Sequence, residues 1–115
     1  MDSLEELKTA LETTGYIVEY RNYNVDDDGN DLPFPQIFYY IDDTELIYAE
    51  DMIALKEHKV VVQLWTVGKD DTAQAKVETA LNQDYTDQSE SYDNDAELYC
   101  YKYVLWITEV VNDVI

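Results

Sequence analysis

The side chains of this chain that can do chemistry are few and lie far apart in the sequence. His58 is the single histidine, and the serines Ser3, Ser89 and Ser91 have no histidine close to them. Nucleophilic catalysis needs a base beside the nucleophile, so a lone histidine at the start of a strand is better interpreted as a solvated strand-end residue. The three glycines are widely separated and form no phosphate-binding loop. We therefore predict no catalytic and no cofactor-binding residue, and expect that the protein is not an enzyme.

One acidic segment has part of the spacing of a metal site. Asn24 to Gly29 matches the first half of a calcium-binding loop, with oxygen ligands at positions 1, 3 and 5 and glycine at position 6. Position 12 should be a bidentate glutamate and is Pro35. We therefore predict an acidic turn over Asp26–Asp31 and no metal ligand, with weak cation binding by this loop as the open alternative.

The single cysteine and the paired carboxylates give no further candidate for a functional site. Cys100 is the only cysteine, so no intrachain disulfide forms, and its place in a tyrosine-rich stretch predicts a small buried apolar residue rather than a reactive thiol. Pairs such as Asp42 and Asp43 are expected by number alone in a chain with 26 acidic residues, and they lie in hydrophilic stretches that would not raise a carboxyl pKa.

The charge balance restricts what the protein binds. The 115 residues carry 26 Asp and Glu against 7 Lys and Arg, a formal net charge of −19, while 46% of the residues are hydrophobic. This hydrophobic content predicts a folded single domain over residues 1–115 with a strongly negative surface. Such a surface disfavours recognition of nucleic acid through its phosphates. The first residues do not resemble a signal peptide, and no apolar stretch is long enough to span a membrane, so we expect synthesis in the cytoplasm.

Hydrophobic periodicity predicts an α+β fold, with an antiparallel sheet of about four strands and two helices packed on one face. The stretch Asp42–Glu57 has no clean period and is interpreted as a poorly regular connection with room for a short strand. The final strand is apolar on both sides, so one side left without a helix would need a partner. The expected helices begin at the N-caps Ser3 and Asp71, and the expected strands are Tyr16–Arg21, Gln36–Ile41, His58–Thr66, Tyr85–Tyr92 and Leu98–Thr108.

The central half of the chain resembles a family of small phage proteins. The resemblance runs over roughly residues 33–108, through the stretches Pro33–Tyr40, Thr44–Asp51, Val60–Thr66, Lys69–Leu81 and Leu98–Leu105. In this respect the chain is similar to the tail-terminator or tail-completion proteins of long-tailed, non-contractile phages and prophages.

The resemblance implies a structural virion protein that caps the tail tube. It implies an α+β subunit that assembles with itself into a closed ring, expected to be a hexamer, which stops tail polymerisation and joins the tail to the head. The implied partners are the major tail tube protein and the head connector or completion protein, in the tail or neck of the virion after assembly in the host cytoplasm. A cyclic ring joins two different patches of each subunit. Because of the two-sided apolar pattern, the last strand and Val60–Trp65 are the expected sheet-based contacts.

Two other functions stay open. The chain has the size of a head-completion or connector adaptor protein, and its acidity also fits an inhibitor that mimics DNA through closely spaced carboxylates. In a ring through which DNA passes, a negative lumen would repel the duplex without binding it. We expect Asp26–Asp31 or Asp84–Glu97 to line that lumen.

Overall fold

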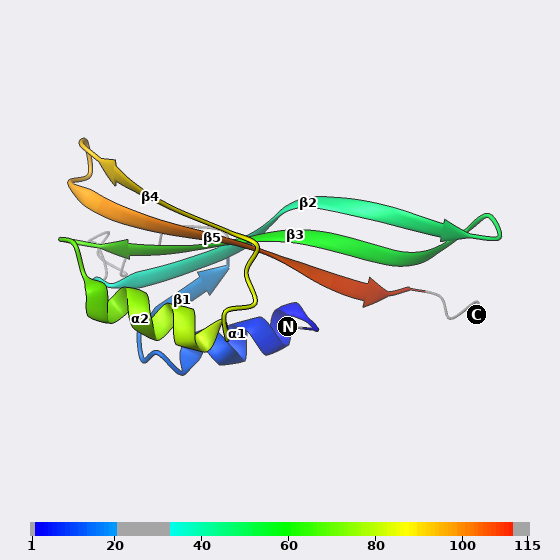
Figure 1. Cartoon of the computed structure of the whole chain (residues 1–115), viewed down its shortest axis with the longest axis horizontal. Helices are drawn as coiled ribbons and strands as arrows, with labels where there is room; N and C mark the ends of the chain where they lie inside the picture. Colours follow the sequence, from blue (N-terminus) through cyan, green and yellow to red (C-terminus); the bar gives the residue numbers. More distant parts are fainter. Residues whose placement is uncertain (1, 21–32, 112–115) are drawn as a thin grey trace, which may run out of the picture.

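The computed structural model describes residues 2–20 and 33–111. It confirms an α+β fold, in which two helices accompany one sheet with the strand order β1-β2-β3-β5-β4 (Figure 1). The elements in chain order are α1 (Leu4–Glu12), β1 (Ile17–Tyr20), β2 (Gln36–Ala49), β3 (Met52–Thr66), α2 (Asp71–Ala80), β4 (Asp87–Asp93) and β5 (Leu98–Val110).

The sheet differs from the expected antiparallel sheet of about four strands. It has five strands and is mixed, because β1 pairs in parallel with β2, from Ile17 opposite Gln36 to Tyr20 opposite Tyr39. The other three pairings are antiparallel. Parallel neighbours need a connection of about a dozen residues or more, and residues 21–35 are long enough to provide one.

Both helices cover the same face of the sheet (Figure 1). Leu7 and Leu11 of α1 and Val77 of α2 are fully buried against alternate residues of the strands, as the period of two in a strand requires. Tyr101 and Tyr103 of β5 point into this core. The sheet residues of the core are Ile37, Tyr39, Val60, Val62, Leu64, Tyr101, Tyr103, Leu105 and Ile107.

Helix α1 starts as the sequence predicts. The Ser3 hydroxyl accepts a hydrogen bond from the Glu6 N–H at 3.0 Å. The Glu6 carboxylate accepts from the Asp2 N–H at 3.2 Å, so the reciprocal bond of this cap goes one residue further back than in a standard capping box.

Helix α2 starts one residue earlier than predicted. Asp70, not Asp71, is the N-cap, and its carboxylate accepts from the Ala73 N–H at 2.9 Å. The Asp70 N–H also donates to the Tyr101 hydroxyl at 3.1 Å. This contact with β5 favours Asp70 over the adjacent Asp71 as the N-cap. The sequence alone does not distinguish between the two aspartates.

The prediction of an irregular connection over Asp42–Glu57 is wrong. This stretch forms the end of a long hairpin, in which β2 and β3 pair as far as Ala49 and Met52 around a two-residue turn. The turn residues Glu50 and Asp51 have φ of 54° and 66°, the left-handed values that suit a tight hairpin. The register shifts twice, between Ile41 and Asp43 and between Ile47 and Tyr48. Each shift interrupts the alternation of side chains, which explains why no period was visible in the sequence.

The far end of the hairpin projects beyond the helices, together with the end of β5 (Figure 1). We call this three-stranded projection, residues 42–59 and 106–111, the arm.

The C-terminal turn of α2 is joined to the sheet through Glu78. The buried Tyr103 hydroxyl donates to one Glu78 oxygen at 2.9 Å, and the Tyr85 hydroxyl donates to the other at 3.4 Å. Burial, followed by the hydrogen bond to Glu78, raises the pKa of Tyr103 above its usual value of 10.0.

We predict that Tyr103→Phe changes the alkaline stability of the fold. At pH 8 the variant should lose about 1–2 kcal/mol of unfolding free energy, because a hydrogen bond to a charged group is lost. Since the folded-state pKa is raised, the contribution of Tyr103 is complete below pH 10 and is lost as pH rises above it. The unfolding free energy of the variant should therefore fall less steeply above pH 10, by up to about 1.4 kcal/mol per pH unit.

Denaturant titrations at several pH values measure this difference. The exposed Tyr48→Phe is the control and should follow the wild type. Equal slopes for Tyr103→Phe and the wild type would contradict the prediction.

Candidate functional site

The sequence predicted that His58 lies at a strand end, and this prediction is wrong. It lies within β3, and only 12% of its side chain is exposed. Its Nδ1 is 2.9 Å from the Thr44 hydroxyl on β2, and its Nε2 is 3.8 Å from a Glu109 carboxylate oxygen on β5. Sequence reasoning missed this cluster because three separate strands bring the residues together, and no local pattern reports the register between them.

The cluster has the residue types of a nucleophilic triad but not its geometry. In a triad the carboxylate hydrogen-bonds the imidazole and orients it. A separation of 3.8 Å between His58 and Glu109 is too long for that bond. The Thr44–His58 contact instead links β2 to β3 where the arm leaves the body.

Metal ligands are not gathered anywhere in residues 2–20 and 33–111. No group of three or more His, Cys, Asp or Glu side chains in this part of the chain can hold an ion. The acidic loop from Asn24 to Gly29 lies outside the described residues, so the absence of a metal site there stays a prediction.

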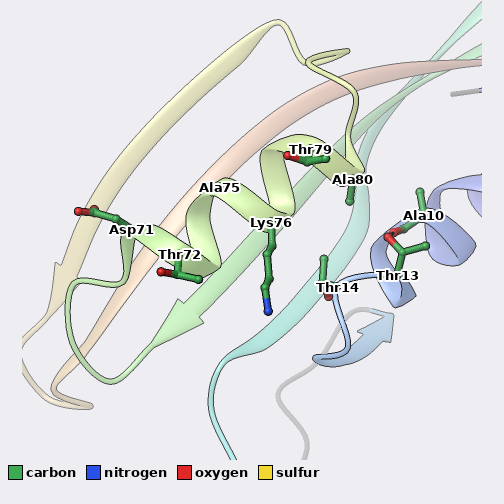
Figure 2. Close-up of a pocket in the computed structure, with 9 residues that line it drawn as sticks. All are labelled: Ala10, Thr13, Thr14, Asp71, Thr72, Ala75, Lys76, Thr79 and Ala80. Carbon is green, nitrogen blue, oxygen red and sulfur yellow. Dashed lines mark hydrogen bonds between the residues drawn. The ribbon is translucent and has the colours of Figure 1, made fainter.

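A hollow with a volume of ≈ 800 Å³ is an open groove between the two helices (Figure 2). Small side chains make up most of its lining. Lys76 projects from α2, with its ammonium 5.2 Å from the centre of the Tyr16 ring. This lining provides no paired acid and base. The residues that line the groove are Ala10, Thr13, Thr14, Asp71, Thr72, Ala75, Lys76, Thr79 and Ala80.

The arm carries most of the exposed apolar surface of the described chain. Nine large hydrophobic side chains are exposed in that part, and six of them lie on the arm. Tyr48 next to the turn is 61% exposed, and Val110 on β5 is 66% exposed. Contiguous apolar patches on a protein surface are typical of contacts with another molecule. The six are Leu46, Tyr48, Met52, Trp106, Val110 and Val111.

A row of acidic side chains lies on the opposite end of the sheet, on β4. The predicted polar strand near residues 85–92 is confirmed as β4, in which every residue is exposed. It carries Asp87, Glu90 and Asp93 along the outer edge strand. The Asp26–Asp31 loop, the other predicted lumen segment, lies outside the described residues.

The predicted self-association strands need correction. Val60–Trp65 belongs to β3, which lies between β2 and β5 and has no open edge there. Tyr101 and Tyr103 are 1% and 0% exposed beneath the helices, so a charge at either position would disrupt the core. The exposed large hydrophobic side chains of β5 are Trp106 and Val110.

Cys100 is buried and free, as predicted. Burial raises the pKa of its thiol to about 11. Because the thiolate is the reactive form, the folded protein should leave this group inert.

We predict that a thiol reagent such as DTNB labels Cys100 only as fast as the protein opens. Folded protein at pH 8 should react far more slowly than protein in denaturant, and a Cys100→Ser variant should not react in either state. Complete labelling of the folded protein at the rate of a free thiol would contradict this prediction.

The described helices are too short to cross a membrane. No protein-family model matches the chain, and no curated protein matches it.

Proposed function

We propose that this protein is a structural virion protein that assembles as a ring on the phage tail tube. It stops tail polymerisation there and forms the joint to the head connector. The observation that carries the proposal is the arm, which extends from a helix-covered body and ends in exposed apolar side chains. An arm of this form cannot bury its own surface and needs another subunit to cover it.

The sequence resemblance includes one stretch of the arm and several of the helix-covered body. The stretch Thr44–Asp51 forms the end of β2 and the turn of the arm, and Val60–Thr66 forms the part of β3 beneath the helices. In the proposed ring, the body would keep the subunit folded and the arm would contact the tail tube or a neighbouring subunit. The cyclic contact joins the arm of one subunit to a different patch on the next.

We further propose that β4 and its flanking turns face the channel of the ring. Asp87, Glu90 and Asp93 are exposed along one edge strand, and Asp95 and Glu97 follow in the turn. A row of carboxylates repels DNA phosphates, which would let the duplex pass without adhering. A ring with β4 on its outer rim would contradict this assignment.

A head-completion or connector adaptor is a second candidate that uses the same ring and arm. The two are separated by what the ring binds, because a terminator binds tail tubes and an adaptor binds the portal end. The acidic β4 edge also favours a DNA-mimic inhibitor, which would bind a DNA-processing enzyme and would not need the arm.

We predict that a charge near the arm tip weakens tail capping. Tyr48→Asp should weaken binding to tail tubes about tenfold or more, because a tyrosine buried at the contact contributes roughly 2 kcal/mol. Its melting temperature should stay close to that of the wild type, since the side chain is 61% exposed. Negative-stain images of tail-tube subunits polymerised with each variant give the tube lengths and the capped ends.

Val67→Asp is the matched control. Val67 is 67% exposed and lies outside the arm, so the same charge there should leave capping unchanged. Wild-type protein that neither forms rings nor shortens tubes would overturn the proposed function.

A further inference from the structure

The sheet has four stretches of outer edge in the described residues, and three of them are short or carry carboxylates that bond backbone N–H groups. β1 has only four residues, and short edge strands limit pairing with other chains. On β2 beyond Tyr39, the Asp43 carboxylate accepts the Thr44 N–H at 2.9 Å, and Asp42 and Glu45 add charge. On β4, the Asp87 carboxylate accepts the Gln88 N–H at 2.8 Å. Carboxylates that cover backbone donors in this way oppose the addition of a further strand.

The fourth stretch is the edge of β5 beyond Val104, where β4 no longer pairs with it. Its residues from Leu105 to Val110 include one charged side chain, Glu109. Trp106 is 42% exposed and Val110 is 66% exposed. No side chain in residues 2–20 or 33–111 accepts a hydrogen bond from the backbone of Trp106, Thr108 or Val110.

The direction of the backbone groups on this edge follows from two hydrogen bonds. The Val111 N–H donates to the Ala54 carbonyl of β3 at 2.9 Å, so this odd-numbered residue faces β3. The Val104 carbonyl accepts from the Thr86 N–H at 2.7 Å, so this even-numbered residue faces away from β3. The register between β3 and β5 is unbroken from Leu55 opposite Val110 to Thr66 opposite Tyr99. The N–H and C=O groups of Trp106, Thr108 and Val110 therefore all point to the open edge.

We propose that this edge pairs with the same edge of a second copy of the chain. Two β5 strands run antiparallel around a two-fold axis at Thr108, so that Trp106 of each copy lies opposite Val110 of the other. Each of the three outward-facing residues then exchanges both of its backbone hydrogen bonds with its opposite residue.

The side chains on this edge are complementary to themselves. Trp106 meets Val110 of the second copy, an aromatic side chain beside a β-branched one, and the two Thr108 side chains lie side by side. Glu109 lies opposite Ile107, so no carboxylate faces a carboxylate. Pairing β2 with β2 or β4 with β4 would instead bring acidic edges together in a protein of net charge −19.

The available length also fits. Trp106 to Val110 of one strand covers the same five residues of the other, and β4 with Thr86 occupies the next outward-facing position at Val104. This contact is isologous, so it is additional to the head-to-tail contacts of the proposed ring and does not depend on them.

Thr108→Pro tests the pairing. The substitution removes an outward-facing N–H and leaves the hydrogen bonds to β3 in place, since proline is tolerated on edge strands. Sedimentation or light scattering of the free protein should show a wild-type dimer. The variant loses two symmetric hydrogen bonds and should dissociate at least about tenfold more readily. Gln88→Pro makes the same change on the outer edge of β4 and should dimerise like the wild type.

A cysteine variant gives a second readout that does not need proline. In the two-fold pairing, the two Thr108 Cα atoms are about 5.5 Å apart, within the range of a disulfide. Thr108→Cys should therefore form a covalent dimer on oxidation, and Gln88→Cys should not.

A monomeric wild type, a Thr108→Pro variant that dimerises like the wild type, or equal cross-linking of the two cysteine variants would each overturn the inference. Ring formation on tail tubes is scored separately, so failure of the proposed function and failure of this pairing are distinguishable.

Discussion

The length difference between the helices and the strands determines the shape of this molecule. The helices have 9 and 10 residues and are about 15 Å long at 1.5 Å per residue. The β3 strand has 15 residues and extends about 50 Å at 3.3 Å per residue, close to the longest dimension of 50 Å. Even placed end to end, the helices cover only part of one face. The rest of the sheet extends past the helices as an arm without a helical layer, and apolar side chains such as Tyr48 and Val110 are exposed there.

Charge is unevenly placed along the outer edges of this sheet. A subunit of net charge −19 repels its own copies, so contacts between copies are favoured where carboxylates are sparse. Asp43 and Asp87 each cover a backbone N–H on an outer strand, which places acidic side chains where an added strand would have to lie. The end of β5 has no equivalent residue, and Trp106 and Val110 are exposed there. In the proposed pairing, the acidity would therefore limit contacts between copies to a small part of the sheet.

Hydrophobic periodicity correctly predicted the elements that pack against one another. Leu7 and Leu11 of α1, Val77 of α2 and the alternation in the last strand were readable because each follows one regular period over its length. The prediction for the end of the β2–β3 hairpin was wrong because two register shifts interrupt the hydrophobic period there. The parallel pairing of β1, the Asp70 cap and the cluster around His58 were missed for another reason. Each depends on a neighbour that is distant in the sequence, and one sequence contains no record of such neighbours.

Composition and local period were enough to predict the α+β class, the buried state of Cys100 and the negative surface. The sequence of β5 presents two apolar faces and does not say which of them the helices cover. In the folded protein, Tyr101 and Tyr103 lie on the covered face, whereas Trp106 lies on the opposite face and is 42% exposed. The choice of face depends on where α1 and α2 pack against the sheet, and no residue within β5 encodes that contact.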